Sequence, residues 1–168
     1  TWNEPGQGIK ITLGPNDLPP TEPQVGREFT RFVLYEMAGG THGSFPWWLE
    51  EGIAEFGGNL LSTLSHRNRV LQQVAARSIA PEGAAERLIA WDDIATRPDW
   101  PPDEMQMVAD QAFSFVQFVT ETAGEDARNA WIGALAANEP FDEACQDHLG
   151  ASFAELDGQW RAWLAGQL

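Results

Sequence analysis

The sequence predicts a mainly α-helical fold. Apolar residues recur at helical spacing along most of the 168 residues, and Gly or Pro marks the turns between these stretches. Only residues 8–13 have the composition of a short strand. A chain of this length buries about two-thirds of the surface that its unfolded form exposes, so we expect a single hydrophobic core.

Residues 1–20 are expected to form an N-terminal arm with one short strand, Gly8–Leu13. Gly14-Pro15 and Pro19-Pro20 interrupt the backbone after it. A lone strand is not a sheet, so three arrangements stay open. The strand pairs with further chain of a larger protein, pairs with a protein partner, or lies along the helices as an edge piece.

Residues 21–168 are expected to fold as one helical domain. A first helix is predicted from about Thr21 to Ala38, where Gly39-Gly40 end it, and a second from residues 44–46 through Leu64. A more polar third helix follows over 66–78, and prolines make 79–102 irregular apart from a short helical piece. Further helices are predicted over 103–123, 125–137, 140–149 and 153–164.

Composition limits the classes of partner. The net charge of −15 repels a nucleic-acid backbone, so we expect no nucleic-acid partner. No run of about 18 apolar residues is present, so no membrane-spanning segment is expected. The single cysteine, Cys145, excludes an internal disulfide and is predicted to be a small buried side chain.

Two stretches place charged residues one helical turn apart. Arg27 and Arg31 share one helix face, and Glu51 and Glu55 share another, because residues four apart lie on the same side of a helix. If the two helices pack side by side, the arginines meet the carboxylates.

The second stretch, PWWLEEGIAEF at 46–56, resembles the peptidase MA-like group of gluzincin zinc metallopeptidases. In that family a helix with His-Glu-x-x-His is followed by a helix that begins Pro-x-Trp-Leu-x-Glu-Gly-x-Ala-Glu-Tyr. Segments at 110–116, 141–144 and 149–164 are similar to the family's C-terminal half. The resemblance covers roughly residues 22–168. It implies a zincin-like helical domain without most of the family's sheet, and it is compatible with an extracytoplasmic location, although the sequence leaves the compartment open.

The zinc motif itself departs from the family pattern. It reads Arg27-Glu28-Phe29-Thr30-Arg31, so arginines stand where the family has its two histidine ligands. A guanidinium group stays protonated and has no lone pair for zinc. The resemblance places Glu28 at the general base, Glu51 at the third zinc ligand, and Ala109 where members often carry a tyrosine. We therefore predict that zinc is lost and that the chain has no metal cofactor.

Charge explains how such a site can persist. Two guanidinium groups carry the same +2 as Zn²⁺, so an arginine pair can balance the carboxylates without a metal. The sequence predicts that one arginine binds Glu51 while the other reaches Glu28 or Glu55.

Three functional hypotheses follow. The favoured one is a catalytically inactive, metal-free binding or scaffold module whose cleft holds a peptide or another acidic ligand. The alternative is a zinc-independent enzyme with Glu28 as general acid or base and Arg27 and Arg31 binding an anionic substrate. The third is a metal enzyme that uses His42 with Glu51 and Glu28.

Simpler interpretations stand beside these roles. Arg27 and Arg31 are more readily explained as partners of Glu51 and Glu55 than as ligand-binding groups. Trp47 is the tryptophan most able to face a groove, although packing at the edge of the core is favoured.

Overall fold

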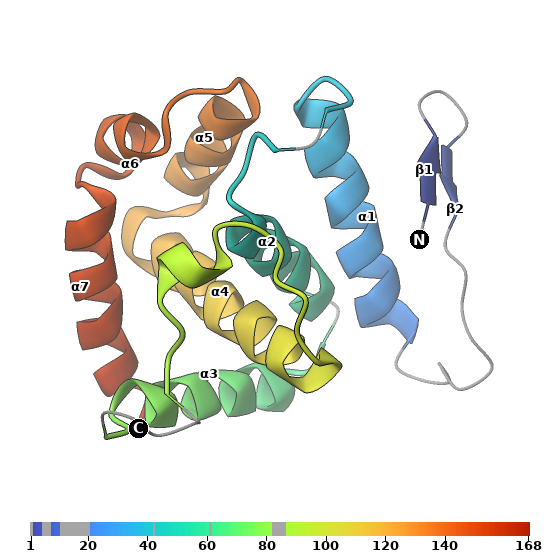
Figure 1. Cartoon of the computed structure of the whole chain (residues 1–168). Helices are drawn as coiled ribbons and strands as arrows, with labels where there is room; N and C mark the ends of the chain where they lie inside the picture. Colours follow the sequence, from blue (N-terminus) through green and yellow to red (C-terminus); the bar gives the residue numbers. More distant parts are fainter. Residues whose placement is uncertain (1, 5–7, 11–20, 42, 61, 82–86) are drawn as a thin grey trace.

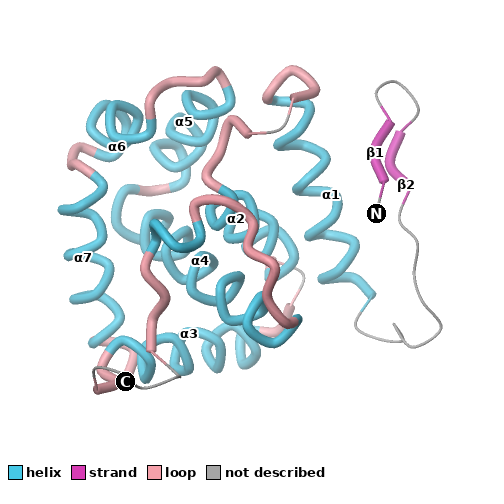
Figure 2. Tube along the Cα trace, in the orientation of Figure 1, coloured by secondary structure: helices cyan, strands magenta, loops and turns pink. Residues whose placement is uncertain are grey.

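The computed structural model describes residues 2–4, 8–10, 21–41, 43–60, 62–81 and 87–168. The chain is mainly helical, as predicted, and loops join the helices directly (Figures 1 and 2). None of the described helices is long and apolar enough to cross a membrane. The elements in chain order are β1 (Trp2–Glu4), β2 (Gly8–Lys10), α1 (Thr21–Met37), α2 (Trp47–Asn59), α3 (Leu64–Ser78), the 3-10 helix η1 (Trp91–Ile94), α4 (Pro102–Ala123), α5 (Glu125–Ala136), α6 (Phe141–Leu149) and α7 (Phe153–Ala165).

The N-terminal arm contributes a two-stranded antiparallel sheet. Of the strand expected over 8–13, the part Gly8–Lys10 is described, and it pairs with β1 with Asn3 opposite Ile9. Residues 11–13 lie outside the described part of the chain. The described part of this strand therefore pairs within the arm, an arrangement that the sequence pattern did not indicate.

The predicted extent of the second helix was wrong. α2 ends at Asn59 instead of continuing through Leu64, and a separate helix begins at Leu64. The side chain of Asn59 returns to the Glu55 carbonyl at 3.0 Å, and glycines at 57 and 58 weaken the last turn. Thr63 then caps α3 by accepting a hydrogen bond from the His66 backbone N–H at 3.2 Å.

Aromatic rings from distant helices form the centre of the core. Trp48 of α2 lies 4.3 Å from Trp91 and 5.7 Å from Phe115 between ring centroids, and Trp91 lies 5.1 Å from Trp160 of α7. Two of the indole N–H groups have polar partners, since Trp160 Nε1 donates to Ser114 Oγ at 3.1 Å and Trp91 Nε1 donates to Asp157 Oδ1 at 2.7 Å. These contacts join α2, η1, α4 and α7 into one core.

Cys145 is fully buried, and burial raises the pKa of its thiol to about 12.

Glycines let α2 pack closely between α1 and α4 (Figure 1). A Cβ atom at Gly52 would lie 2.7 Å from the Ala112 backbone of α4. A Cβ atom at Gly58 would lie 2.5 Å from the Pro23 carbonyl oxygen of α1. The helix that carries Glu51 and Glu55 is therefore held against both neighbours at contact distance.

Candidate functional site

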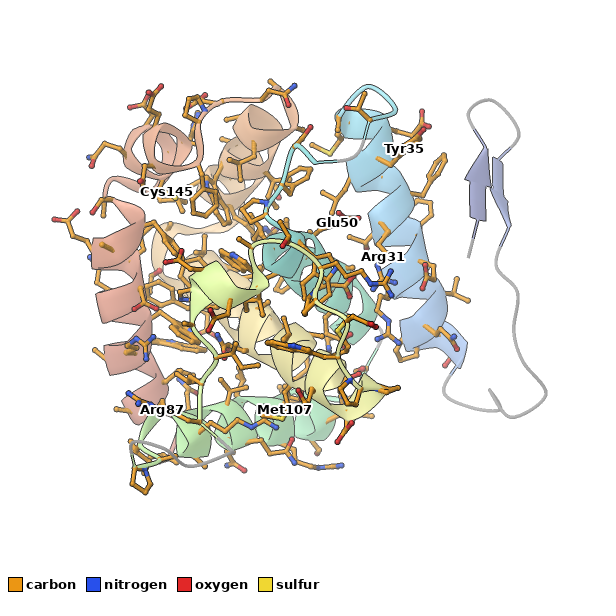
Figure 3. The ribbon with its side chains drawn as sticks, in the orientation of Figure 1. Arg31, Tyr35, Glu50, Arg87, Met107 and Cys145 are labelled. Carbon is orange, nitrogen blue, oxygen red and sulfur yellow. The ribbon has the colours of Figure 1, made fainter. Side chains whose placement is uncertain are left out.

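The charged residues of α1 and α2 meet as an ion-pair network. Arg31 Nη1 donates to Glu28 Oε1 at 2.7 Å, and its Nη2 donates to Glu51 Oε2 at 2.5 Å. Figure 3 shows Arg31 reaching from α1 toward α2. One turn earlier on α1, Arg27 Nη1 donates to Glu55 Oε2 at 2.9 Å. The predicted bridge between the two helices is thus present, with Arg31 as its branch point.

The network lies partly out of the solvent. The side chains of Arg31, Glu28 and Glu51 are 25%, 13% and 20% exposed. Burial opposes the charge of Arg31, but the attraction of Glu51 and Glu28 outweighs it and raises the pKa of the guanidinium. Arg31 therefore holds two carboxylates together as a permanently charged group.

The carboxylate of Glu55 has a second partner on its own helix. Asn59 Nδ2 donates to Glu55 Oε1 at 3.1 Å.

Together the two arginines and the three glutamates at 28, 51 and 55 carry a formal charge of −1. Two neutral histidines, Zn²⁺ and the same three glutamates would also carry −1, so the arginine pair reproduces the charge balance of a zinc centre.

The donors at this place do not fit zinc. Arg31 occupies the space between Glu28 and Glu51, where the resemblance would put a metal, and guanidinium nitrogens offer no lone pair. Among the described residues, no three His, Cys, Asp or Glu side chains form a group that could hold a metal ion. His42, the histidine considered as an alternative ligand, lies outside the described residues.

A cleft of about 570 Å³ opens beside the network. Its inner wall includes Arg27, Glu51 and Ala109, and its outer wall is the irregular segment before α4. Glu28 and Arg31 are not among its lining residues. The cleft is lined by Arg27, Glu51, Arg97, Pro98, Asp99, Trp100, Pro102, Met105, Gln106 and Ala109.

Buried contacts fix the segment that forms the outer wall. The side chain of Gln111, 1% exposed, accepts from the Ile89 N–H and donates to the Ile89 carbonyl, both at 2.9 Å. The Trp47 N–H donates to the Ala95 carbonyl at 2.8 Å, and Trp91 between them lies in the core. The segment that continues into Arg97 is therefore tied down at three points.

Trp47 does not face this cleft. It lines a second groove of about 520 Å³ together with Ser44, Glu50 and Thr96. Residues 95 and 96 border this groove, whereas residues 97–99 border the cleft. It is also half-buried and packs against the hydrophobic core. The structure thus brings Arg27, Glu28, Arg31, Glu51 and Glu55 together and leaves Trp47 outside.

Sequence reasoning missed one buried acid next to the site. Asp110 of α4 is 9% exposed, and its Oδ1 accepts a hydrogen bond from Gln106 Nε2 at 2.8 Å. Burial, together with the negative charge of Glu55, raises the pKa of Asp110, while the Gln106 hydrogen bond and the charges of Arg77 and His66 oppose this. A lone Asp within the apolar run 107–119 was the available signal.

Comparison with known proteins gives no match to a family model, to a curated protein or to a solved structure. The function must therefore be argued from the site itself.

We expect Arg31→Ala to lower the free energy of unfolding by about 3 kcal/mol, because it leaves Glu28 and Glu51 half-buried and facing each other. Urea denaturation of the purified variant measures this change. Arg161→Ala is the matched control, since Arg161 makes an exposed pair with Asp157 on the same helix, and its cost should stay below about 0.5 kcal/mol. An equal decrease in the free energy of unfolding for the two variants would contradict a bridging role for Arg31.

We expect Asp110→Asn to raise the melting temperature at pH 7. Above the ordinary pKa of aspartate, the native state retains a proton that the unfolded state has lost, so the stability of the native protein falls as the pH rises through this window. Asparagine does not titrate, so the loss of stability with rising pH disappears, and its Oδ1 can still accept the hydrogen bond from Gln106. Thermal melts are recorded from pH 3 to pH 7 at about one-unit steps. The melting temperatures of the wild type and of Asp110→Asn should become equal at the acid end. The exposed Asp147→Asn is the control, and an Asp110→Asn protein that is less stable at pH 7 would refute the assignment.

Proposed function

We propose that this chain is a metal-free, non-catalytic relative of the gluzincin peptidases that acts as a binding or scaffold module. The observation that carries the proposal is Arg31, which binds the residues at the positions of the family's general base and third ligand. In this arrangement the positive charge that a peptidase would supply with a metal is part of the polypeptide. The helix pair is then stable without a cofactor.

The same geometry argues against the zinc-independent enzyme. A general base must reach the substrate, and Glu28 does not line the cleft. Its Oε1 also accepts a hydrogen bond from Arg31 at 2.7 Å, so this oxygen is already occupied. Glu28 serves the proposal as a structural partner of Arg31.

The residues that line the cleft favour a peptide with acidic side chains as its ligand. Arg97 lines the cleft and makes no ion pair with a described carboxylate, so it is available to a carboxylate of the ligand. Glu51 uses Oε2 for Arg31, and its Oε1 has no hydrogen bond to a described residue, so it suits a peptide N–H donor. Trp100 and Met105 add apolar surface between these groups.

The metal-free character has a direct test. Elemental analysis of the wild-type protein should show no stoichiometric zinc, and casein should stay uncleaved with or without a chelator. The double variant Arg27→His with Arg31→His should gain about one zinc per chain, because it restores two imidazole ligands opposite Glu51.

The matched control is Arg27→Gln with Arg31→Gln, which removes the same charges without adding ligands. Circular dichroism shows whether each variant is folded. Folded histidine variants that bind no zinc would refute the family resemblance, and chelator-sensitive cleavage by the wild type would refute the non-catalytic proposal.

Ligand binding is tested at Arg97. A fluorescein-labelled peptide of alternating Glu and Pro, which cannot form a helix, should bind the wild type, and Arg97→Ala should weaken binding about tenfold or more through loss of a charge-assisted hydrogen bond. Fluorescence anisotropy measures both. Arg161→Ala should leave the affinity unchanged, whereas an unchanged affinity of the Arg97→Ala protein would exclude the cleft as the binding site.

A further inference from the structure

Helix α4 presents one of its faces to the cleft. Pro102, Met105, Gln106 and Ala109 stand at positions i, i+3, i+4 and i+7, which share one side of a helix, and all four line the cleft. Gln106 is exposed, and of these four residues it alone has a side chain with strong hydrogen-bond donors and acceptors. The polar contribution of α4 to the cleft is therefore the amide of Gln106.

One end of this amide is already occupied. Gln106 Nε2 donates to Asp110 Oδ1 at 2.8 Å, one turn further along the same helix. Because the Asp110 oxygen accepts, the amide turns its nitrogen toward Asp110. The other end, Gln106 Oε1, has no hydrogen bond to a described residue. The amide oxygen is thus the end that remains for a ligand.

A second pair on α4 has the same spacing in a different environment. Gln117 Nε2 donates to Glu121 Oε1 at 2.8 Å, also across one helical turn. Glu121 is exposed, whereas Asp110 is 9% exposed. Water replaces an exposed hydrogen-bond partner at little cost, but a buried acceptor that loses its donor is left unsatisfied. The amide of Gln106 is therefore held more firmly than that of Gln117.

The inner wall of the cleft then carries two acceptors from neighbouring helices. Glu51 of α2 contributes its Oε1, and Gln106 of α4 contributes its own Oε1. Arg97 on the outer wall is a donor. A small polycarboxylate would satisfy Arg97 and leave both acceptors without donors. A peptide suits both walls, because its backbone N–H groups donate and its acidic side chains accept.

We propose that Asp110 is a positioning residue of the cleft, which holds Gln106 so that the amide oxygen accepts a hydrogen bond from a backbone N–H of the bound peptide. This inference rests on the proposed function, because it takes an acidic peptide as the ligand of the cleft. It adds that the cleft recognises the backbone of the peptide as well as its charge, and that a buried residue outside the lining of the cleft controls this recognition.

The first measurement uses the free protein. Heteronuclear NMR should show that the side-chain amide protons of Gln106 exchange with water more slowly than those of Gln117, because their acceptor is buried. In Asp110→Ala, whose fold is checked by circular dichroism, this difference should disappear. Equal exchange at Gln106 and Gln117 in the wild type would overturn the positioning role whether or not a ligand binds.

The second measurement compares two fluorescein-labelled peptides by anisotropy. One is the alternating Glu and Pro peptide, and the other has N-methyl-Glu at each Glu, which removes the backbone N–H groups because Pro has none. The preference of the wild type for the first peptide should fall about fivefold in Gln106→Ala, as expected for one lost hydrogen bond. Comparing this preference between proteins cancels the effect of methylation on the peptide itself.

The variants at Asp110 separate positioning from a general structural role. Asp110→Ala should lower the preference as Gln106→Ala does, and the double variant should be no worse than Gln106→Ala alone, because Asp110 acts through Gln106. Asp110→Asn keeps an acceptor for Gln106 and should retain the wild-type preference. Gln117→Ala, which removes the matched amide on the exposed part of α4, should retain it as well.

The outcomes distinguish this inference from the proposed function. Binding that Arg97→Ala weakens but whose preference Gln106→Ala leaves unchanged would overturn the inference alone and keep the acidic peptide as ligand. Additive effects of Gln106→Ala and Asp110→Ala would also overturn it, since they would show that Asp110 acts independently of Gln106. No binding of either peptide to the wild type would overturn both.

Discussion

The contact on which the candidate site depends is the one that Arg31 makes between α1 and α2. Two carboxylates, Glu28 and Glu51, approach each other from neighbouring helices, and without a cation between them their repulsion would separate the helices. A guanidinium fits because its planar, branched donors reach two acceptors at once. The close approach that Gly58 permits between α1 and α2 brings these charges within reach.

The cleft beside this bridge is formed by parts of the chain that are far apart in sequence. Its inner wall comes from α1, α2 and α4, and its outer wall from the irregular segment at 97–100. The stretch that leads into it, residues 89–95, is held by Gln111, by Trp47 and by the burial of Trp91. Anchoring the stretch that precedes the wall reduces the ordering that a ligand must impose.

Two features of the chain separate fold from function. The sequence resemblance raises the expectation of a peptidase-like fold, whereas in the structure Arg31 lies between Glu28 and Glu51, where such a fold would hold its metal. Helix α3 is a second feature, because it carries Arg67, Arg69 and Arg77 without an acidic residue, and the charges of Arg77 and His66 act on the buried Asp110 of α4.

The sequence by itself determined the helical content, most helix ends and the pairing of arginines with carboxylates, because helical periodicity and charges four residues apart act locally. It did not determine where α2 stops, since apolar residues continue at helical spacing to Leu64 while the structure starts a separate helix there, capped by Thr63. Only the tertiary structure showed the burial of Asp110, the separation of Trp47 from the cleft and the position of Arg97 in the cleft wall, because each arises from residues that packing brings together across long distances in the chain.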